Sequence, residues 1–355
     1  MDSSKQPVGI AVIGAGLMGR QHTSSAMACP DVELIGVTAV DARQAHELAA
    51  KHGTTDLGSV EAALADDRVE AVIIATPTNT HDELAAAALS AGKHAFVEKP
   101  VTRTLEAALE LRALARSHDR MLGVGHVIRY FAEYRKIAAT LEAGGIGTPA
   151  VATLGRRCQQ PDWAPDKWHT DMARSGGVAI DMMIHDVDLV RWYFGEPTQV
   201  YARVIGSDKH DGLDYALATL TVPGGPICHL HGSWAEPEGF SQSAEIAGSM
   251  GMIDYDSRGR GELQLMAHAG TENATALPPP PTGPQDPFQR QLSDFAAAIR
   301  TGSTFPGDID WAIGSLRIAL AMVESSDTRD VVNISSLEHF FASQDANLTT
   351  AGGVA

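Results

Sequence analysis

Residues 8–19 read VGIAVIGAGLMG, and they decide the fold of the N-terminal part of the chain. The first six are apolar or glycine, which suits a buried parallel strand. The next six form a G-x-G-x-x-G turn, and a helix-like stretch then runs as far as Ala28. A strand, a glycine turn and a helix in this order predict the first unit of a parallel α/β sheet.

The glycine turn also predicts an anion site. Gly14 permits the tight turn, Gly16 lets the backbone approach a pyrophosphate, and Gly19 allows close packing of helix on strand. Free N–H groups and the dipole at the start of the helix favour a negative group there. We therefore expect a dinucleotide to bind at Gly14, Gly16, Leu17, Met18 and Gly19.

Strand and helix patterns alternate as far as residue 125. Short apolar runs are separated by helical stretches that end at glycine or polar residues. The expected strands are 8–13, 32–39, 71–75, 94–97 and 121–125, and the expected helices after the first are 42–52, 81–91 and 104–118. Repeated β-α units predict a doubly wound parallel sheet, a Rossmann domain, over residues 1–125.

After residue 127, β-like runs dominate between Gly- and Pro-rich turns. These runs are 150–154, 199–205, 215–222, 227–234 and 243–247, and helices are expected at 131–142, 177–194, 287–301 and 310–325. Strands in succession predict an α+β domain with a large open, mainly antiparallel sheet. We assign 126–340 to this substrate and oligomerisation domain and 341–355 to a flexible tail.

The end of the second strand bears on which dinucleotide binds. An acid there usually contacts the ribose 2′-hydroxyl of NAD. Ala39 occupies the expected acid position, and Asp41 comes two residues later. Arg43 can meet the 2′-phosphate of NADP, although an exposed arginine is the commoner case. The choice between NAD and NADP stays open, with NAD slightly favoured.

Polar residues in two places suggest oxidation of an alcohol. Asp181 and His185 are four residues apart, so they share one face of a helix, and Asp188 extends that face. Histidine suits the base that removes a hydroxyl proton, and a neighbouring carboxylate can orient it. Lys99 follows the apolar run 94–97, at the strand end where open sheets bind ligands, and its ammonium can stabilise an alkoxide. A structural polar pair and a surface lysine are the alternatives.

The order of these motifs resembles a known family. The glycine turn, ATPTNTH over 75–81, Glu98-Lys99-Pro100 and the GG-x3-D-x3-HD-x-D pattern over 176–188 are similar to the glucose–fructose oxidoreductase, inositol dehydrogenase and rhizopine-catabolism family, Gfo/Idh/MocA. The resemblance covers residues 8–337. It implies a Rossmann domain followed by a domain on a large open sheet. It also implies NAD(P)-dependent interconversion of a hydroxyl and a carbonyl on sugars, inositols or related rings.

The resemblance further implies which residues contact the ligands. Those expected at the dinucleotide are Thr76, Pro77, Asn79, His81, Glu98, Lys99 and Trp168. His169 stands where the family often has arginine, which puts that contact in doubt. Candidate substrate residues are Arg129, Trp163, His169 and Asp188, with packing as the alternative for the first two. His229 and His231 share a strand face but have no evident third ligand, so no metal is expected.

Composition narrows the class of protein. The 355-residue chain has a formal net charge of −17, which offers no footprint for nucleic acid or anionic membranes. Three cysteines far apart and without C-x-x-C fit a reducing compartment. The N-terminus lacks a secretory pattern, and no apolar run approaches the ~20 residues of a membrane helix. We expect a cytoplasmic protein.

Together these features predict an NAD(P)-dependent dehydrogenase or reductase acting on a secondary hydroxyl or carbonyl of a cyclic polyol, sugar or sugar derivative. The alternatives are a dehydrogenase of a non-sugar substrate, such as a dihydrodiol, and a non-catalytic NAD(P)-sensing module. An open sheet leaves one face without a helical cover, which predicts a homodimer or homotetramer through that sheet.

Overall fold

The computed structural model describes residues 6–161, 167–206, 214–259, 263–267, 286–337, 339–342 and 344. The chain divides into two compact units, each assembled from three stretches. The first unit comprises Met1–Lys136, Pro161–Gly176 and Pro279–Leu316, and the second unit comprises Ile137–Gln160, Gly177–Pro278 and Arg317–Ala355. Most of the expected tail, 341–355, lies outside the described residues.

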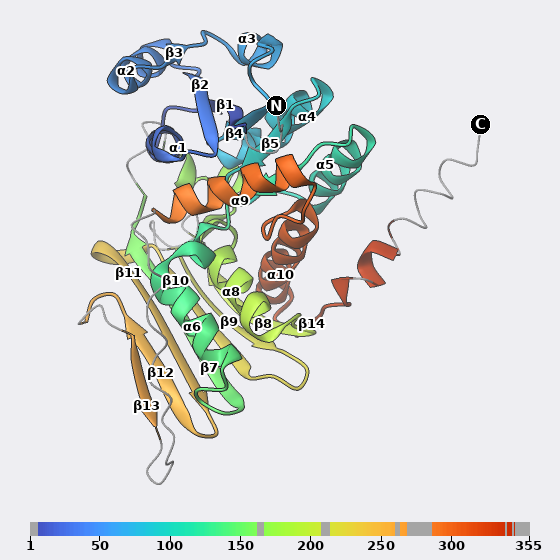
Figure 1. Cartoon of the computed structure of the whole chain (residues 1–355). Helices are drawn as coiled ribbons and strands as arrows, with labels where there is room; N and C mark the ends of the chain where they lie inside the picture. Colours follow the sequence, from blue (N-terminus) through green and yellow to red (C-terminus); the bar gives the residue numbers. More distant parts are fainter. Residues whose placement is uncertain are drawn as a thin grey trace. The chain divides into compact units, whose positions relative to one another are not determined.

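The first unit contains a six-stranded parallel sheet in the order β3-β2-β1-β4-β5-β6 (Figure 1). This is the strand order of dinucleotide-binding domains, which bind their ligand where the order reverses, between β1 and β4. The strands are β1 (Val8–Ile13), β2 (Val32–Thr38), β3 (Thr55–Asp56), β4 (Ala71–Ile74), β5 (His94–Val97) and β6 (Leu122–Val124). The predicted Rossmann sheet is confirmed.

Helices cover this sheet, and local signals set their ends. Asp41 caps α2, Thr104 caps α5, and Gly53 ends α2 in the left-handed conformation. The helical elements of the unit are α1 (Leu17–Ala28), α2 (Ala42–His52), α3 (Val60–Ala65), η2 (Thr78–Thr80), α4 (His81–Ser90), α5 (Leu105–Ser117), η3 (Val127–Tyr130), η4 (Trp168–Thr170), α7 (Met172–Ser175) and α9 (Pro287–Thr301).

Helix α9 completes the core of the first unit although it comes late in the chain. It packs against α1 and β2. Its Phe295 contributes to a cluster of apolar side chains that covers one face of the sheet. Phe295 packs edge-on against Phe96 of β5, with 5.4 Å between ring centroids. Helix α9, which lies within the stretch 126–340, thus stabilises the parallel sheet of the first unit.

The second unit is built on an eight-stranded sheet in the order β13-β12-β11-β7-β10-β9-β8-β14. Its strands are β7 (Pro149–Gln159), β8 (Gln199–Ile205), β9 (Tyr215–Thr221), β10 (Ile227–Ser233), β11 (Ala235–Gly248), β12 (Gly251–Asp256), β13 (Gln264–Ala267) and β14 (Val332–Asn333). All neighbours are antiparallel except β7 and β10, which are parallel. The sheet is therefore mixed, and it is mainly antiparallel, as predicted.

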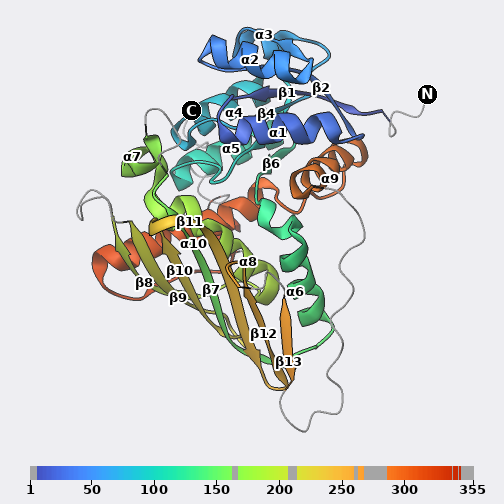
Figure 2. The ribbon, with the colours of Figure 1, turned by 90° about the vertical axis from the view of Figure 1, so that its left-hand side faces the viewer.

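The two faces of this sheet differ. Helix α8 (Ile184–Phe194) packs on β7 and β10, and strand residues on that side, such as Leu154 and Leu230, are buried. Residues that alternate with them, such as Leu217 and Ile227, are each 50% exposed. Figure 2 shows the strands of this sheet side by side.

The remaining helices are α6 (Ala132–Glu142), η5 (Val178–Met182) and α10 (Ile309–Thr328).

Two absences hold for the part of the chain that the structure describes. No helix there is long and apolar enough to cross a membrane. No group of three or more His, Cys, Asp or Glu side chains could hold a metal ion. The three cysteines Cys29, Cys158 and Cys228 are buried and form no disulfide.

Candidate active site

The glycine turn of the first unit has the geometry of a phosphate loop. Gly14 has φ of +116°, and a Cβ added there would lie 2.4 Å from the Ala75 carbonyl oxygen. A Cβ at Gly19 would lie 2.0 Å from the Gly14 carbonyl oxygen, whereas one at Gly16 would have no neighbour within 4 Å. Gly14 and Gly19 thus allow close backbone contacts, and Gly16 leaves one side of the turn open.

The open side of this turn is also where α1 begins. Gly16 is the N-cap of α1, and Leu17 and Met18 are its first residues. Because glycine has no side chain to cap the helix, the first N–H groups of α1 remain available to an anion. The residues present therefore fit the pyrophosphate of a dinucleotide.

The region after β2 contains an acid that is already engaged. Ala39 follows the strand and is partly buried. The Asp41 carboxylate caps α2, accepting from the backbone N–H groups of Arg43 at 3.0 Å and Gln44 at 3.3 Å and from Gln44 Nε2 at 2.9 Å. Hydrogen bonds from Gln44, then from Arg43, hold the pKa of Asp41 below its usual value. Arg43 is exposed on α2.

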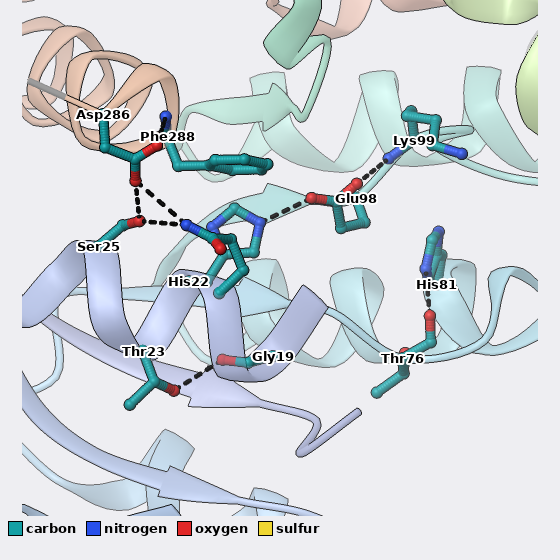
Figure 3. Close-up of polar contacts among 11 residues, drawn as sticks. Gly19, His22, Thr23, Ser25, Thr76, His81, Glu98, Lys99, Asp286 and Phe288 are labelled. Atoms are coloured by element: carbon teal, nitrogen blue, oxygen red, sulfur yellow. Dashed lines mark hydrogen bonds and ion pairs between the residues drawn. The ribbon is translucent and has the colours of Figure 1, made fainter. Parts of the chain in front are cut away.

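The loop after β4 is held by a buried histidine. Nε2 of His81 lies 3.0 Å from the Thr76 carbonyl oxygen (Figure 3). Nδ1 lies 2.9 Å from the Pro100 carbonyl oxygen. Burial lowers the pKa of His81, so the neutral ring donates to one of these carbonyls at a time. His81 thus connects the loop after β4 with the segment after β5. Pro77 is partly exposed and Asn79 is exposed on that loop.

Lys99 follows β5 next to a buried carboxylate. Glu98 Oε1 accepts a hydrogen bond of 2.7 Å from Nε2 of His22 on α1. Glu98 Oε2 accepts one of 3.2 Å from the Lys99 backbone N–H. Lys99 itself is partly exposed at the carboxyl end of its strand. His22 was not among the residues singled out from the sequence, because nothing local marks a histidine in mid-helix as the partner of a distant acid.

The Trp168 segment also belongs to the first unit. Trp168 stacks on His169 with 3.8 Å between ring centroids. Arg174 Nε donates to Asn79 Oδ1 at 3.3 Å, and Arg103 Nη2 donates to the Met172 carbonyl oxygen at 3.0 Å. The segment is thereby held beside the loop after β4, which carries several of the expected dinucleotide contacts.

Asp181 and His185 lie in the second unit on a helix that is less regular than predicted. The expected helix 177–194 is a π-helix, η5, followed by a turn at Met183 and by α8. The N–H of Met183 bonds to the Val178 carbonyl oxygen at 2.9 Å, a span of five residues. Asp181 is buried in η5, and His185 is partly exposed at the start of α8. Such π-turns occur frequently at functional sites.

The two acids after His185 are both buried. Asp186 accepts hydrogen bonds from Arg156 on β7, at 2.9 Å from Nη2 and 3.3 Å from Nε. Asp188 is 1% exposed. The Arg156 pair therefore ties the start of α8 to the sheet beneath it.

The remaining candidates that the structure describes make contacts of their own. Arg129 donates to the Pro306 carbonyl oxygen at 3.2 Å, and its guanidinium lies 4.3 Å from the centre of the Trp311 ring. His231 accepts from Arg157 Nε at 3.2 Å, and His229 lies 3.2 Å from the Thr219 hydroxyl. Trp163 lies outside the described residues.

Comparison with known proteins identifies the family. Residues 8–126 match an oxidoreductase family with an NAD-binding Rossmann fold, and residues 134–254 match the GFO/IDH/MocA C-terminal domain. The chain is 29% identical over 303 residues to myo-inositol 2-dehydrogenase of Thermotoga maritima, covering 82% of this chain and 88% of that protein. It is 28% identical over 324 residues to scyllo-inositol 2-dehydrogenase (NAD(+)) of Bacillus subtilis, covering 89% and 93%.

A solved structure agrees with this assignment. GenD2 from gentamicin A biosynthesis, in complex with NAD, matches with a TM-score of 0.80 and 27% identity over 93% of this chain and 97% of that chain. The resemblance inferred from the motifs is thus confirmed over both parts of the sequence, and the protein belongs to the GFO/IDH/MocA family of NAD-binding oxidoreductases.

Proposed function

We propose that the protein is an inositol-dehydrogenase-like enzyme that transfers hydride between nicotinamide and one secondary hydroxyl or carbonyl of a cyclic polyol, sugar or sugar derivative. One observation carries this proposal above the others. The chain combines an open phosphate turn at Gly16 with a lysine at the end of β5 and an acid–histidine pair around a π-turn. The names of the inositol dehydrogenases that it resembles favour the same substrate class.

The roles of the three polar residues follow from their chemistry. In the oxidation direction, His185 accepts the proton of the substrate hydroxyl, and Asp181 orients the imidazole and stabilises its cation. The Lys99 ammonium stabilises the negative charge that develops on the oxygen. The bound dinucleotide supplies the hydride acceptor.

The cofactor is proposed to be NAD, with NADP also used. Ala39 neither binds a 2′-hydroxyl nor repels a 2′-phosphate, and Asp41 is occupied as the cap of α2. The exposed Arg43 supplies a positive charge on the same helix. Three buried cysteines that form no disulfide support a cytoplasmic location.

The test is turnover of NAD(P)+ with a panel of inositols, aldoses and other sugars, and the reverse reaction with ketosugars and NAD(P)H. Turnover of a ring polyol or sugar supports the proposal. Turnover of dihydrodiols alone would move the substrate outside that class. Binding of NAD(P)H without turnover of any panel member would instead favour a sensing module.

We also propose that copies of the chain assemble through the exposed face of the large sheet. Apolar side chains on neighbouring strands of that face are Val151, Tyr201, Ile205, Leu217 and Ile227. Ile227 pairs with Val151 across β10 and β7, so these two lie side by side. Exposed apolar side chains gathered on one sheet face mark an interaction surface, and a homodimer or homotetramer buries them.

A further inference from the structure

The buried Glu98 carboxylate contacts two groups: His22 on helix α1, which begins at the phosphate turn, and Lys99, the next residue in the chain. One of its oxygens receives the His22 N–H at 2.7 Å, and the other receives the Lys99 backbone N–H at 3.2 Å. A Cβ on Gly125, after β6, would lie 3.2 Å from the carboxyl atoms, so the glycine leaves them room. Oε1 therefore joins helix α1 to the segment after β5, and Oε2 holds the backbone of the next residue, Lys99, within that segment.

The His22 ring is fixed from both sides. It lies edge-on to Phe96 of β5 and to Phe288 of α9, with 5.5 Å between centroids in each case. Figure 3 shows the ring directed at the Glu98 carboxylate from the middle of α1. Burial alone would raise the pKa of Glu98, but the His22 hydrogen bond and neighbouring positive charge hold it below its usual value. The link is thus a hydrogen bond to an ionised carboxylate, which is among the stronger kinds.

We propose that His22 is a positioning residue for the reaction: acting through Glu98, it holds the Lys99 backbone in register with helix α1, whose first turn binds the dinucleotide phosphates. His22 is one turn beyond Gly19 on the same helix. A shift of α1 is therefore transmitted to Lys99 through two hydrogen bonds. The expected effect of His22 on turnover rests on the proposed function. The hydrogen-bonded link from His22 through Glu98 to Lys99 does not.

Two amide substitutions separate this role from simple packing. In His22→Gln the amide nitrogen reaches the position of Nε2, which contacts Glu98. In His22→Asn the shorter side chain reaches only the position of Nδ1, so the contact is lost. Ser25→Ala is the control on the same helix, because Ser25 donates to Asp286 of the α9 cap at 2.5 Å and not to Glu98.

The first readout is amide hydrogen exchange at Glu98 and Lys99 in the free protein, which needs no substrate. We expect His22→Asn to speed exchange at Lys99 at least about tenfold, as loss of local protection does. His22→Gln and Ser25→Ala should leave it within about twofold. Exchange at Lys99 that is unchanged in His22→Asn overturns the link, whether or not the protein turns over any polyol.

The second readout is the split between kcat and dinucleotide affinity. A displaced lysine should lower kcat about 10- to 100-fold, while the dinucleotide Kd changes less than about threefold, because the phosphate turn is intact. His22→Gln should restore most of kcat. A merely structural His22 would instead lower the melting temperature with kcat unchanged, which overturns the proposal.

Gly125→Ala is a second variant in case His22→Asn does not fold. Its added Cβ presses on the Glu98 carboxyl atoms and should also speed exchange at Lys99. Slow exchange in Gly125→Ala, with a wild-type kcat, counts against positioning. If the wild type itself shows no turnover, the proposed function fails and the exchange data alone decide on the link.

Discussion

Arg156 on β7 donates two hydrogen bonds to the carboxylate of Asp186, the residue directly after His185. Both side chains are 1% exposed, and Arg156 also donates to Gln242 Oε1 at 2.9 Å. A buried pair that is satisfied in this way gives little net stability, but breaking it leaves an uncompensated charge. The pair therefore fixes the start of α8, and with it His185, against the sheet.

Asp186→Ala should lower the free energy of unfolding of the second unit by about 3–5 kcal/mol, because it leaves the Arg156 guanidinium buried without its anion. Denaturant unfolding followed by circular dichroism measures this. The double variant Arg156→Met with Asp186→Leu should recover much of the loss, since no charge remains unpaired. A loss under about 1 kcal/mol in Asp186→Ala, the size of an exposed ion pair, would contradict this.

The neighbouring motif residues His185 and Asp186 thus have different roles: His185 is the proposed base, and Asp186 pairs with Arg156. The sequence alone did not reveal this difference. Spacing placed Asp181 and His185 on one helix, whereas the structure divides that stretch into η5, which holds Asp181, and α8, which holds His185. Spacing did not reveal that Asp181 lies in a π-helix, because helical periodicity is nearly the same for either hydrogen-bond pattern over so few residues. Nor did it reveal that Asp186 faces Arg156, since that depends on how α8 packs on β7.

The fold was more predictable than the contacts. Five of the six strands of the first sheet followed from short apolar runs, whereas the two-residue β3 did not. The strand at 199–205 and the helix at 287–301 agree to the residue. The parallel pairing of β7 and β10 did not follow, because strand composition does not specify partners. Likewise, helix 287–301 was expected from its periodicity, but its packing on the sheet depends on tertiary contacts such as that between Phe295 and Phe96 of β5.

His185→Ala should lower kcat about 100- to 10,000-fold, the range expected for a positioned acid–base group. Dinucleotide binding should persist, because the phosphate turn belongs to the first unit. Steady-state kinetics and fluorescence titration with NADH measure the two quantities. Near-normal turnover of the variant at neutral pH would show that another group is the base.

Charge on the exposed sheet face should break the assembly. Leu217 and Ile227 are each 50% exposed on adjacent strands, and replacing both by glutamate places like charges within the proposed interface. Light scattering should give a multiple of 37.5 kDa for the wild type and a monomer for the double variant. Met27→Glu, an equally exposed apolar position on α1, is the control and should not change the mass. A monomeric wild type at micromolar concentration would overturn the assembly.

Acid should weaken the first unit through His94, at the start of β5. Its Nδ1 accepts a hydrogen bond of 2.9 Å from the Met121 N–H, which requires the unprotonated nitrogen. Burial, followed by the charge of Arg120, lowers the pKa of His94 from 6.5 to about 4. Between these values the unfolded chain binds a proton and the folded chain does not, so stability is fully present above pH 6.5 and falls as pH drops towards 4.

The expected loss from His94 across that window is about 1–2 kcal/mol, discounted because the ring is partly exposed. His94→Asn keeps an acceptor for Met121 but does not titrate, so its stability should fall less steeply with acid. Unfolding free energies at several pH values compare the two proteins. Parallel curves for wild type and variant would show that His94 is not responsible.

Ala39→Asp should shift cofactor preference towards NAD by about 1 kcal/mol or more, roughly the scale of one charge-assisted hydrogen bond. A carboxylate there would bind the 2′-hydroxyl of NAD and repel the 2′-phosphate of NADP, and Ala39 does neither. The measurement is kcat/KM for both cofactors. Asp41→Asn is the control: asparagine also caps a helix, so the NAD/NADP ratio should hold if Asp41 acts only as the cap of α2. If the NAD/NADP ratio of kcat/KM is unchanged in Ala39→Asp but changes in Asp41→Asn, the 2′ position is recognised by Asp41, two residues further along.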